Sequence, residues 1–158
     1  MRRIVPVAIL VPLLVGGCGG DSDGGSARAQ QPRLTQKQFV EQGNQVCIDS
    51  DRRIFRIGGL GSNPTPWRRT RDAAQTAIDE MARLRPPAAK QKRFDSMLAS
   101  ARTLQRAISD VYEGLVGNKY ERAQAAQARA VRADTEIKRK AHGLGLTFCE
   151  QLLTNWPA

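Results

Sequence analysis

Apolar side chains between positions 94 and 115 recur at alternating steps of three and four residues. The seven positions are Phe94, Met97, Ala101, Leu104, Ile108, Val111 and Leu115. An α-helix places residues with this spacing on one face, so the pattern predicts a long amphipathic helix that buries one stripe against neighbours. The same rhythm occurs in three other segments, and this repetition restricts the chain to a fold built from packed helices.

Two of these segments precede the first pattern. The earlier one starts near Thr35 and ends at Gly58-Gly59, and the later one opens with Thr65 as N-cap and Pro66 behind it. Pro86-Pro87 ends the later helix, because the residue before a proline avoids helical angles. The inward positions are Val40, Gly43, Cys47, Ser50, Ile54 and Ile57 in the first helix and Trp67, Thr70, Ala74, Ala77, Met81 and Leu84 in the second.

A fourth helix follows Gly117-Asn118, with Asn118 as its expected N-cap and Gly143 as its C-cap glycine. Its inward positions are Ala123, Ala126, Ala130, Ala133 and Ile137. Four helices joined by tight turns predict an all-α, up-down-up-down four-helix bundle spanning residues 34–158. No segment shows strand alternation with hairpin turns.

The N-terminus predicts export. Arg2 and Arg3 precede a twelve-residue apolar run, which is too short to span a bilayer and fits a cleaved signal. The run leads into Val15-Gly16-Gly17-Cys18, which resembles a lipobox. We therefore expect residues 1–17 to be a lipoprotein signal peptide and Cys18 to carry lipid; the alternative is an ordinary signal peptide with an unmodified Cys18. Residues 18–33 are Gly/Ser/Asp-rich and predict a lipid-anchored flexible linker.

Cys47 and Cys149 remain as an even pair once Cys18 is lipidated, and an exported protein meets an oxidising compartment. They are expected to form a disulfide, the alternative being two buried free thiols. Cys47 lies roughly 16 Å up the first helix, so residues 143–148 must fold back along the bundle to bring Cys149 there. Leu144, Leu146 and Phe148 are then expected to pack onto the core.

Three motifs, taken in order, point to a protein family. They are Phe39…Asn44…Cys47, Leu84-x-Pro86-Pro87-Ala88 and Leu144-Gly145-Leu146-x-x-Cys149. Together with Cys18 they resemble a broad group of small, Arg/Ala-rich actinobacterial lipoproteins, over nearly the whole chain. The resemblance implies a helical fold, a disulfide and export. The group has no assigned biochemical activity, so it implies no mechanism.

The chain contains no recognisable catalytic or cofactor motif. Its only histidine, His142, lies at the expected end of the fourth helix, where a cationic side chain complements the helix dipole. Nucleophile-elbow, phosphate-loop and haem-attachment motifs are absent from the sequence. We therefore expect no catalysis, no cofactor and no metal.

Charge supplies the only sharp functional hypothesis. The chain carries +10, or +8 without Arg2 and Arg3, which favours an anionic lipid or wall polymer as partner rather than nucleic acid, which an exported chain rarely meets. The expected topology gathers cations at the tethered end: Arg83, Arg85, Lys90, Lys92, Arg93, Lys138, Arg139 and Lys140, with Arg33 and Lys37 beside them. The opposite end is also basic, with Arg52, Arg53, Arg56, Arg68, Arg69 and Arg71.

These observations predict a lipid-anchored binding or scaffold module at the outer face of the cytoplasmic membrane. An alternative function is a small-ligand receptor or carrier with a pocket between its helices. The basic residues could also do no more than solvate helix surfaces.

Overall fold

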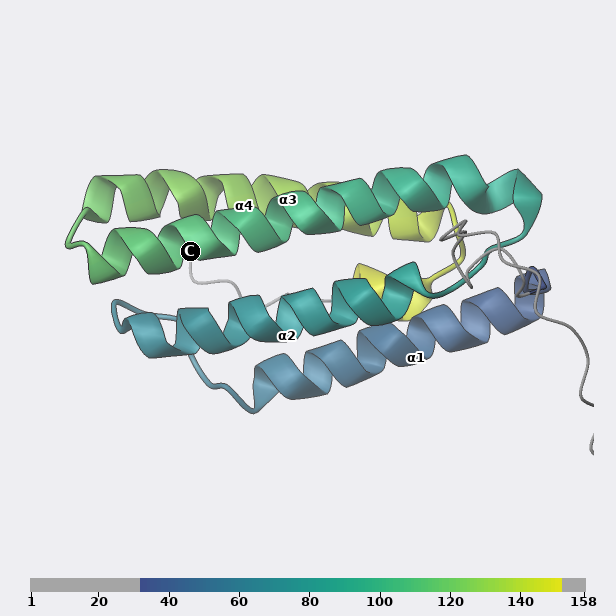
Figure 1. Cartoon of the computed structure of the whole chain (residues 1–158), viewed down its shortest axis with the longest axis horizontal. Coiled ribbons are helices and arrows are strands. Elements are labelled where there is room, and N and C mark those ends of the chain that lie inside the picture. The colour runs from purple at the N-terminus through teal and green to yellow at the C-terminus, as the bar shows by residue number, and fades with distance from the viewer. Residues whose placement is uncertain (1–31, 152–158) are drawn as a thin grey trace, which may run out of the picture.

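The computed structural model describes residues 32–151, and its α-helices lie side by side along one long axis (Figure 1). The elements are α1 (Gln36–Phe55), α2 (Pro64–Ala82), the 3-10 turn η2 (Ala88–Lys90), α3 (Gln91–Val116), α4 (Tyr120–His142) and the 3-10 turn η3 (Thr147–Glu150). Consecutive helices pack on each other, and no strand occurs in this part of the chain. The predicted up-down-up-down bundle is confirmed.

Local hydrogen bonds determine where each helix begins and ends, and the sequence predicted only some of these boundaries. Thr35 caps α1 in a capping box, in which its hydroxyl and the Gln38 side chain satisfy each other's backbone N–H groups. The predicted cap of α2 at Thr65 is wrong. Asn63 is the N-cap, because its Oδ1 accepts from the Thr65 N–H at 2.9 Å, and Pro64 takes the first helical position.

Asn118 ends α3 rather than starting α4, so its predicted role as N-cap is also wrong. It has φ +53°, in the left-handed region. Around it, the Lys119 N–H donates to the Gly114 carbonyl at 2.7 Å and the Asn118 N–H to the Leu115 carbonyl at 3.2 Å. These bonds close the last turn of α3, as left-handed residues commonly do after a helix. The N-cap of α4 is Lys119, without a side-chain bond.

The α3–α4 pair is the most extensively packed pair of helices in the bundle. Alanines line the inner face of α4, and Ala126 and Ala130 have no exposed surface. A Cβ built at Gly114 would lie 2.9 Å from both the Cβ and the backbone nitrogen of Ala123. The missing side chains therefore allow the two backbones to come close at this point.

The segment after α4 folds back between α1 and α4, as predicted. Gly145 has φ +82° where the chain reverses, and Leu144 and Leu146 are completely buried. A Cβ at Gly43 would lie 2.7 Å from Leu146 Cδ2, so the glycine in α1 makes room for this leucine. Among the described elements the backbone of α1 lies close only to α2 and η3, so η3 takes the place of a direct α1–α4 contact, and α1 meets α3 through side chains such as the edge-to-face pair Phe39–Phe94.

The Cys47–Cys149 disulfide joins α1 to η3 across 102 residues, with a Cα–Cα distance of 5.2 Å. Phe148, which was expected in the core, is instead 47% exposed. In a 3-10 turn residues three apart lie on the same side, so Leu146 and Cys149 point inward and Phe148 points outward. Its backbone N–H still donates to Asn44 Oδ1 at 3.1 Å, which ties η3 to α1.

The predicted signal peptide, Cys18 and nearly all of the predicted linker lie outside the described residues. Within residues 32–151 no helix has the length and apolar character needed to cross a bilayer.

Candidate anionic-surface site at the basic end

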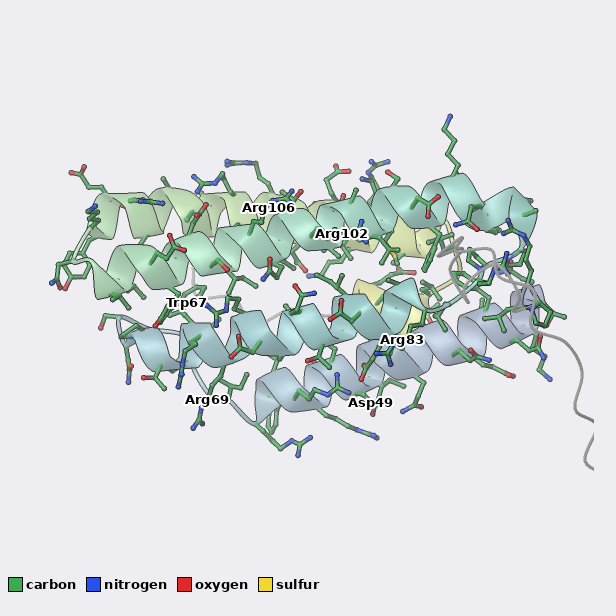
Figure 2. The ribbon with its side chains drawn as sticks, in the orientation of Figure 1. Asp49, Trp67, Arg69, Arg83, Arg102 and Arg106 are labelled. Carbon is green, nitrogen blue, oxygen red and sulfur yellow. A yellow bond between two sulfur atoms is a disulfide. The ribbon has the colours of Figure 1, made fainter. Side chains whose placement is uncertain are left out.

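The antiparallel order of the helices collects the start of α1, the end of α2, the start of α3 and the end of α4 at one end of the molecule, here called the basic end. Positions 33–37, 83–95 and 138–142 contribute two, five and three lysines or arginines, ten in all. Asp95 is the only acidic residue in these ranges. All ten predicted cations therefore lie at or near one end. Figure 2 shows Arg83 and Arg69 toward opposite ends of α2.

The chain reaches α1 from this same end. The Leu34 N–H donates to the Arg85 carbonyl at 2.8 Å, and Arg33 Nη1 donates to the Pro86 carbonyl at 3.0 Å and to Gln91 Oε1 at 2.7 Å. These bonds attach the segment before α1 to the α2–α3 connection. Any tether on the N-terminal side therefore holds the basic end closest to its attachment point.

Two of the predicted contact residues also stabilise the end of α4. Lys90 Nζ and Arg93 Nη1 both donate to the Gly143 carbonyl, at 3.2 and 2.8 Å. The last carbonyls of a helix lack partners within the helix and carry its negative dipole end, so cations are favourable there. A Cβ at Gly143 would lie 2.5 Å from Arg93 Nη1, so the glycine leaves room for this guanidinium.

The three predicted cations on α4 interact along its sides. Lys138 pairs with Asp134 at 2.7 Å, Arg139 pairs with Glu136 at 2.7 Å, and Lys140 Nζ donates to Ser100 Oγ at 2.7 Å. Their charges are thus partly compensated by neighbours in α3 and α4. The structure brings them to the basic end but does not leave them free for an external surface.

Asp134 is a buried acid that the sequence reasoning missed. It is 6% exposed, and this burial raises the pKa of its carboxyl group, while the hydrogen bond from Lys138 acts in the opposite direction. Its position was a usable signal, because it follows the inward Ala130 by four residues. At the surface of the same helix, the hydrogen bond from Arg139 lowers the pKa of Glu136.

Four exposed cations at the basic end keep their charge available to solvent, and they are called the outer cations. Arg83 and Lys92 have no side-chain partner among the described residues, and Arg93 is bound only to a neutral carbonyl. Lys37 makes a loose pair with Glu41 at 3.9 Å, with both side chains largely in solvent. Arg85 is half-buried and takes part in another interaction within the protein, so it is not one of the outer cations.

The opposite end of the bundle has more of its charge compensated. Arg53 binds both oxygens of Glu80 at 2.8 and 3.0 Å, and this hydrogen bonding raises the pKa of the guanidinium. Arg71 pairs with Asp72 at 2.7 Å and lies over the Tyr112 ring. Three of the six arginines at this end, Arg52 included, thus pair with carboxylates. At the basic end four of the ten cations do so, and the two ends therefore differ more in the number of cations than in the share that is paired.

His142 is the last residue of α4, the position that the sequence predicted for it. Its Nδ1 lies 3.2 Å from both carboxylate oxygens of Glu150, so the side chain links α4 to η3. In the described part of the chain no three His, Cys, Asp or Glu side chains lie close enough together to hold a metal ion.

No family model, curated protein or solved structure matches the chain. The protein is a small all-helical bundle with a disulfide, and the distribution of charge over its two ends is the feature that bears on function.

Proposed function

We propose that this protein is a lipid-anchored, extracytoplasmic helical module that binds at the outer face of the cytoplasmic membrane and does not catalyse a reaction. In this proposal lipid on Cys18 provides the anchor, and the outer cations of the basic end contact anionic lipid headgroups. The Cys47–Cys149 disulfide supports a location outside the cytoplasm, since such bonds persist mainly in oxidising compartments.

One observation carries the proposal: the chain reaches the bundle at the end where ten cations gather, and four of these, the outer cations, keep their charge available to solvent. A flexible linker of about fifteen residues has a root-mean-square reach of roughly 20 Å. A lipid on Cys18 would thus hold the basic end, rather than the opposite end of the bundle, within range of the bilayer. The bonds that Leu34 and Arg33 make to the α2–α3 connection limit rotation of the bundle about this attachment.

The outer cations make a measurable electrostatic contribution to the free energy of membrane binding. Each basic residue near an anionic membrane surface contributes about 1 kcal/mol, so the four outer cations together contribute about 4 kcal/mol. One acyl chain alone binds membranes only marginally, and stable attachment needs a second signal. The basic end would supply such a signal in addition to orienting the bundle.

Vesicle flotation of the unlipidated mature chain, with Cys18→Ser, tests the contact. We expect binding to vesicles containing anionic phospholipid at physiological salt and none to neutral vesicles. The variant R83Q/K92Q should bind about thirtyfold more weakly, because two charges are worth about 2 kcal/mol. The matched control R68Q/R69Q removes the same charge from the opposite end and should bind like the parent.

The proposal of a membrane-facing basic end fails if anionic vesicles do not bind the chain, or if the two double variants lose affinity equally. A chain that binds a soluble anionic wall polymer and not vesicles would identify the polymer as the partner. The anchor is tested separately by the mass of the protein purified from its own membranes, which should begin at Cys18 and carry added acyl mass.

A further inference from the structure

A narrow apolar cavity lies among the four helices next to the disulfide. Its volume is about 80 Å³, and all four helices and η3 contribute to its wall. No charged side chain lines it, and apart from the disulfide sulfurs the only heteroatoms among the lining side chains belong to Ser50, Thr70 and two methionines. Nothing in the proposed membrane contact uses this cavity.

The shape of the cavity favours a chain over a compact ring. The lining runs from Thr70 to Met81 along α2 and from Met97 to Ile108 along α3, a separation of eleven positions in each case. At 1.5 Å per residue this corresponds to a length of about 16 Å. Pockets for drug-sized molecules have volumes of about 300–1,000 Å³, and a cavity of about 150 Å³ holds a benzene ring. A volume of about 80 Å³ is about half that of the benzene cavity, so the site has room for a few carbon atoms at the end of a single alkyl chain and not for a ring.

Thr70 places a hydroxyl without a partner in this apolar wall. The residue has no exposed surface, and its Oγ1 has no hydrogen-bond partner among the described atoms. Three other helical threonines donate to the carbonyl four residues earlier: Thr76 at 3.0 Å, Thr103 at 3.1 Å and Thr135 at 3.1 Å. Thr70 does not make this bond. An unsatisfied buried hydroxyl is costly, so a ligand oxygen in the cavity would remove a penalty that the free protein carries.

Charge limits the kind of oxygen that the site accepts. A carboxylate would be buried beside Thr70 without a cation in the lining, and burial of an unpaired charge is strongly unfavourable. A hydroxyl or ester oxygen has no such cost. The wall on the α1 side consists of side chains, since among the described elements the α1 backbone does not come close to that of α3 or α4, and side chains such as Phe39 and Phe94 meet between them. This wall is therefore the place where a chain can enter with little backbone movement.

We propose that the cavity binds the end of a neutral alkyl chain of lipid origin, whose hydroxyl or ester oxygen makes a hydrogen bond to Thr70. The site is independent of the basic end, so each can fail without the other. A lipid chain held here would give the protein a cargo or a sensor function in addition to its contact with the membrane.

Titration of the mature protein with 1-octanol, followed by calorimetry and by the melting temperature, tests the site. We expect saturable 1:1 binding and a higher melting temperature with 1-octanol, and at least tenfold weaker binding of octanoate at neutral pH. Thr70→Val keeps the shape but removes the hydroxyl, and should weaken octanol binding about tenfold. Thr70→Ser should retain binding, and Thr103→Val is the matched control that should leave it unchanged.

The chain itself offers a competing occupant. If octanol binds only after residues 152–158 are removed, these residues occupy the cavity and the proposal of an external ligand is wrong. Non-saturable binding, equal affinity for octanoate, or unchanged affinity in Thr70→Val would each overturn it as well. Ala101→Leu, which fills the cavity from α3, should abolish binding in a chain that still melts cooperatively.

Discussion

Loss of the disulfide should release α1 more than any other helix. Among the described elements the backbone of α1 lies close only to α2 and η3, and the Cys47–Cys149 bond joins it to η3. The bond thus closes a ring of contacts that runs through all four helices and back to α1. The variant C47A/C149A opens this ring while it leaves the α2–α3 and α3–α4 interfaces untouched.

The expected loss follows from the length of the closed loop. For a loop of 102 residues the chain-entropy model gives a stabilisation of about 4.7 kcal/mol. Domains of this size typically have a free energy of unfolding of about 5–15 kcal/mol. The variant should therefore retain a folded state with a much smaller margin. Both cysteines are buried, so the loss of sulfur contacts adds to the entropic effect.

Urea unfolding followed by far-UV circular dichroism measures the total loss, and native-state hydrogen exchange locates it. We expect the free energy of unfolding to fall by about 3–5 kcal/mol. Amides of α1 and residues 144–151 should lose protection first, whereas α3 and α4 keep theirs close to the global limit. Reduced wild-type protein should behave like the variant.

The opposite result is easy to recognise. If protection falls evenly over all four helices, or the free energy of unfolding changes by less than about 1 kcal/mol, then α2 alone holds α1 in place. The contact pattern would then be a poor guide to which parts of the bundle unfold together.

Three further predictions concern stability. Gly114→Ala should lower the free energy of unfolding by about 1–3 kcal/mol although alanine favours helices, because its Cβ would lie 2.9 Å from the α4 backbone. Gly61→Ala, which has open space around the added Cβ, is the control, and urea unfolding midpoints of the two variants give the comparison. Leu146→Ala should cost about 2–5 kcal/mol and Phe148→Ala less than about 0.5 kcal/mol, reversing the order expected from side-chain size. Burial raises the pKa of Asp134 above 3.8, so at pH values just above 3.8 the folded state binds more protons than the unfolded state, and the stability falls as the pH rises through this window. Asp134→Asn should remove this dependence and flatten that part of a pH series of melting temperatures. An unchanged slope would contradict the assignment to Asp134.

The amino-acid sequence was sufficient to predict the helices, their inward faces and the pairing of Cys47 with Cys149. Helix formation depends on contacts within a few residues, so an apolar spacing of three and four residues carries the information directly. The bundle topology followed as well, because short connections leave antiparallel packing as the simplest solution. The gathering of ten cations at one end is a direct consequence of that topology.

Packing between distant segments decided the rest. Whether Lys138 and Lys140 are free to face solvent depends on Asp134 in the same helix and on Ser100 in α3, and the distance to Ser100 is determined only by the packed bundle. The insertion of η3 between α1 and α4 and the unsatisfied hydroxyl of Thr70 arise in the same way. A periodic pattern specifies which face turns inward, but it does not specify how closely two faces meet or what remains between them. Those gaps and partners depend on side-chain volumes summed over several helices, and they produce both the cavity and the difference between the two ends.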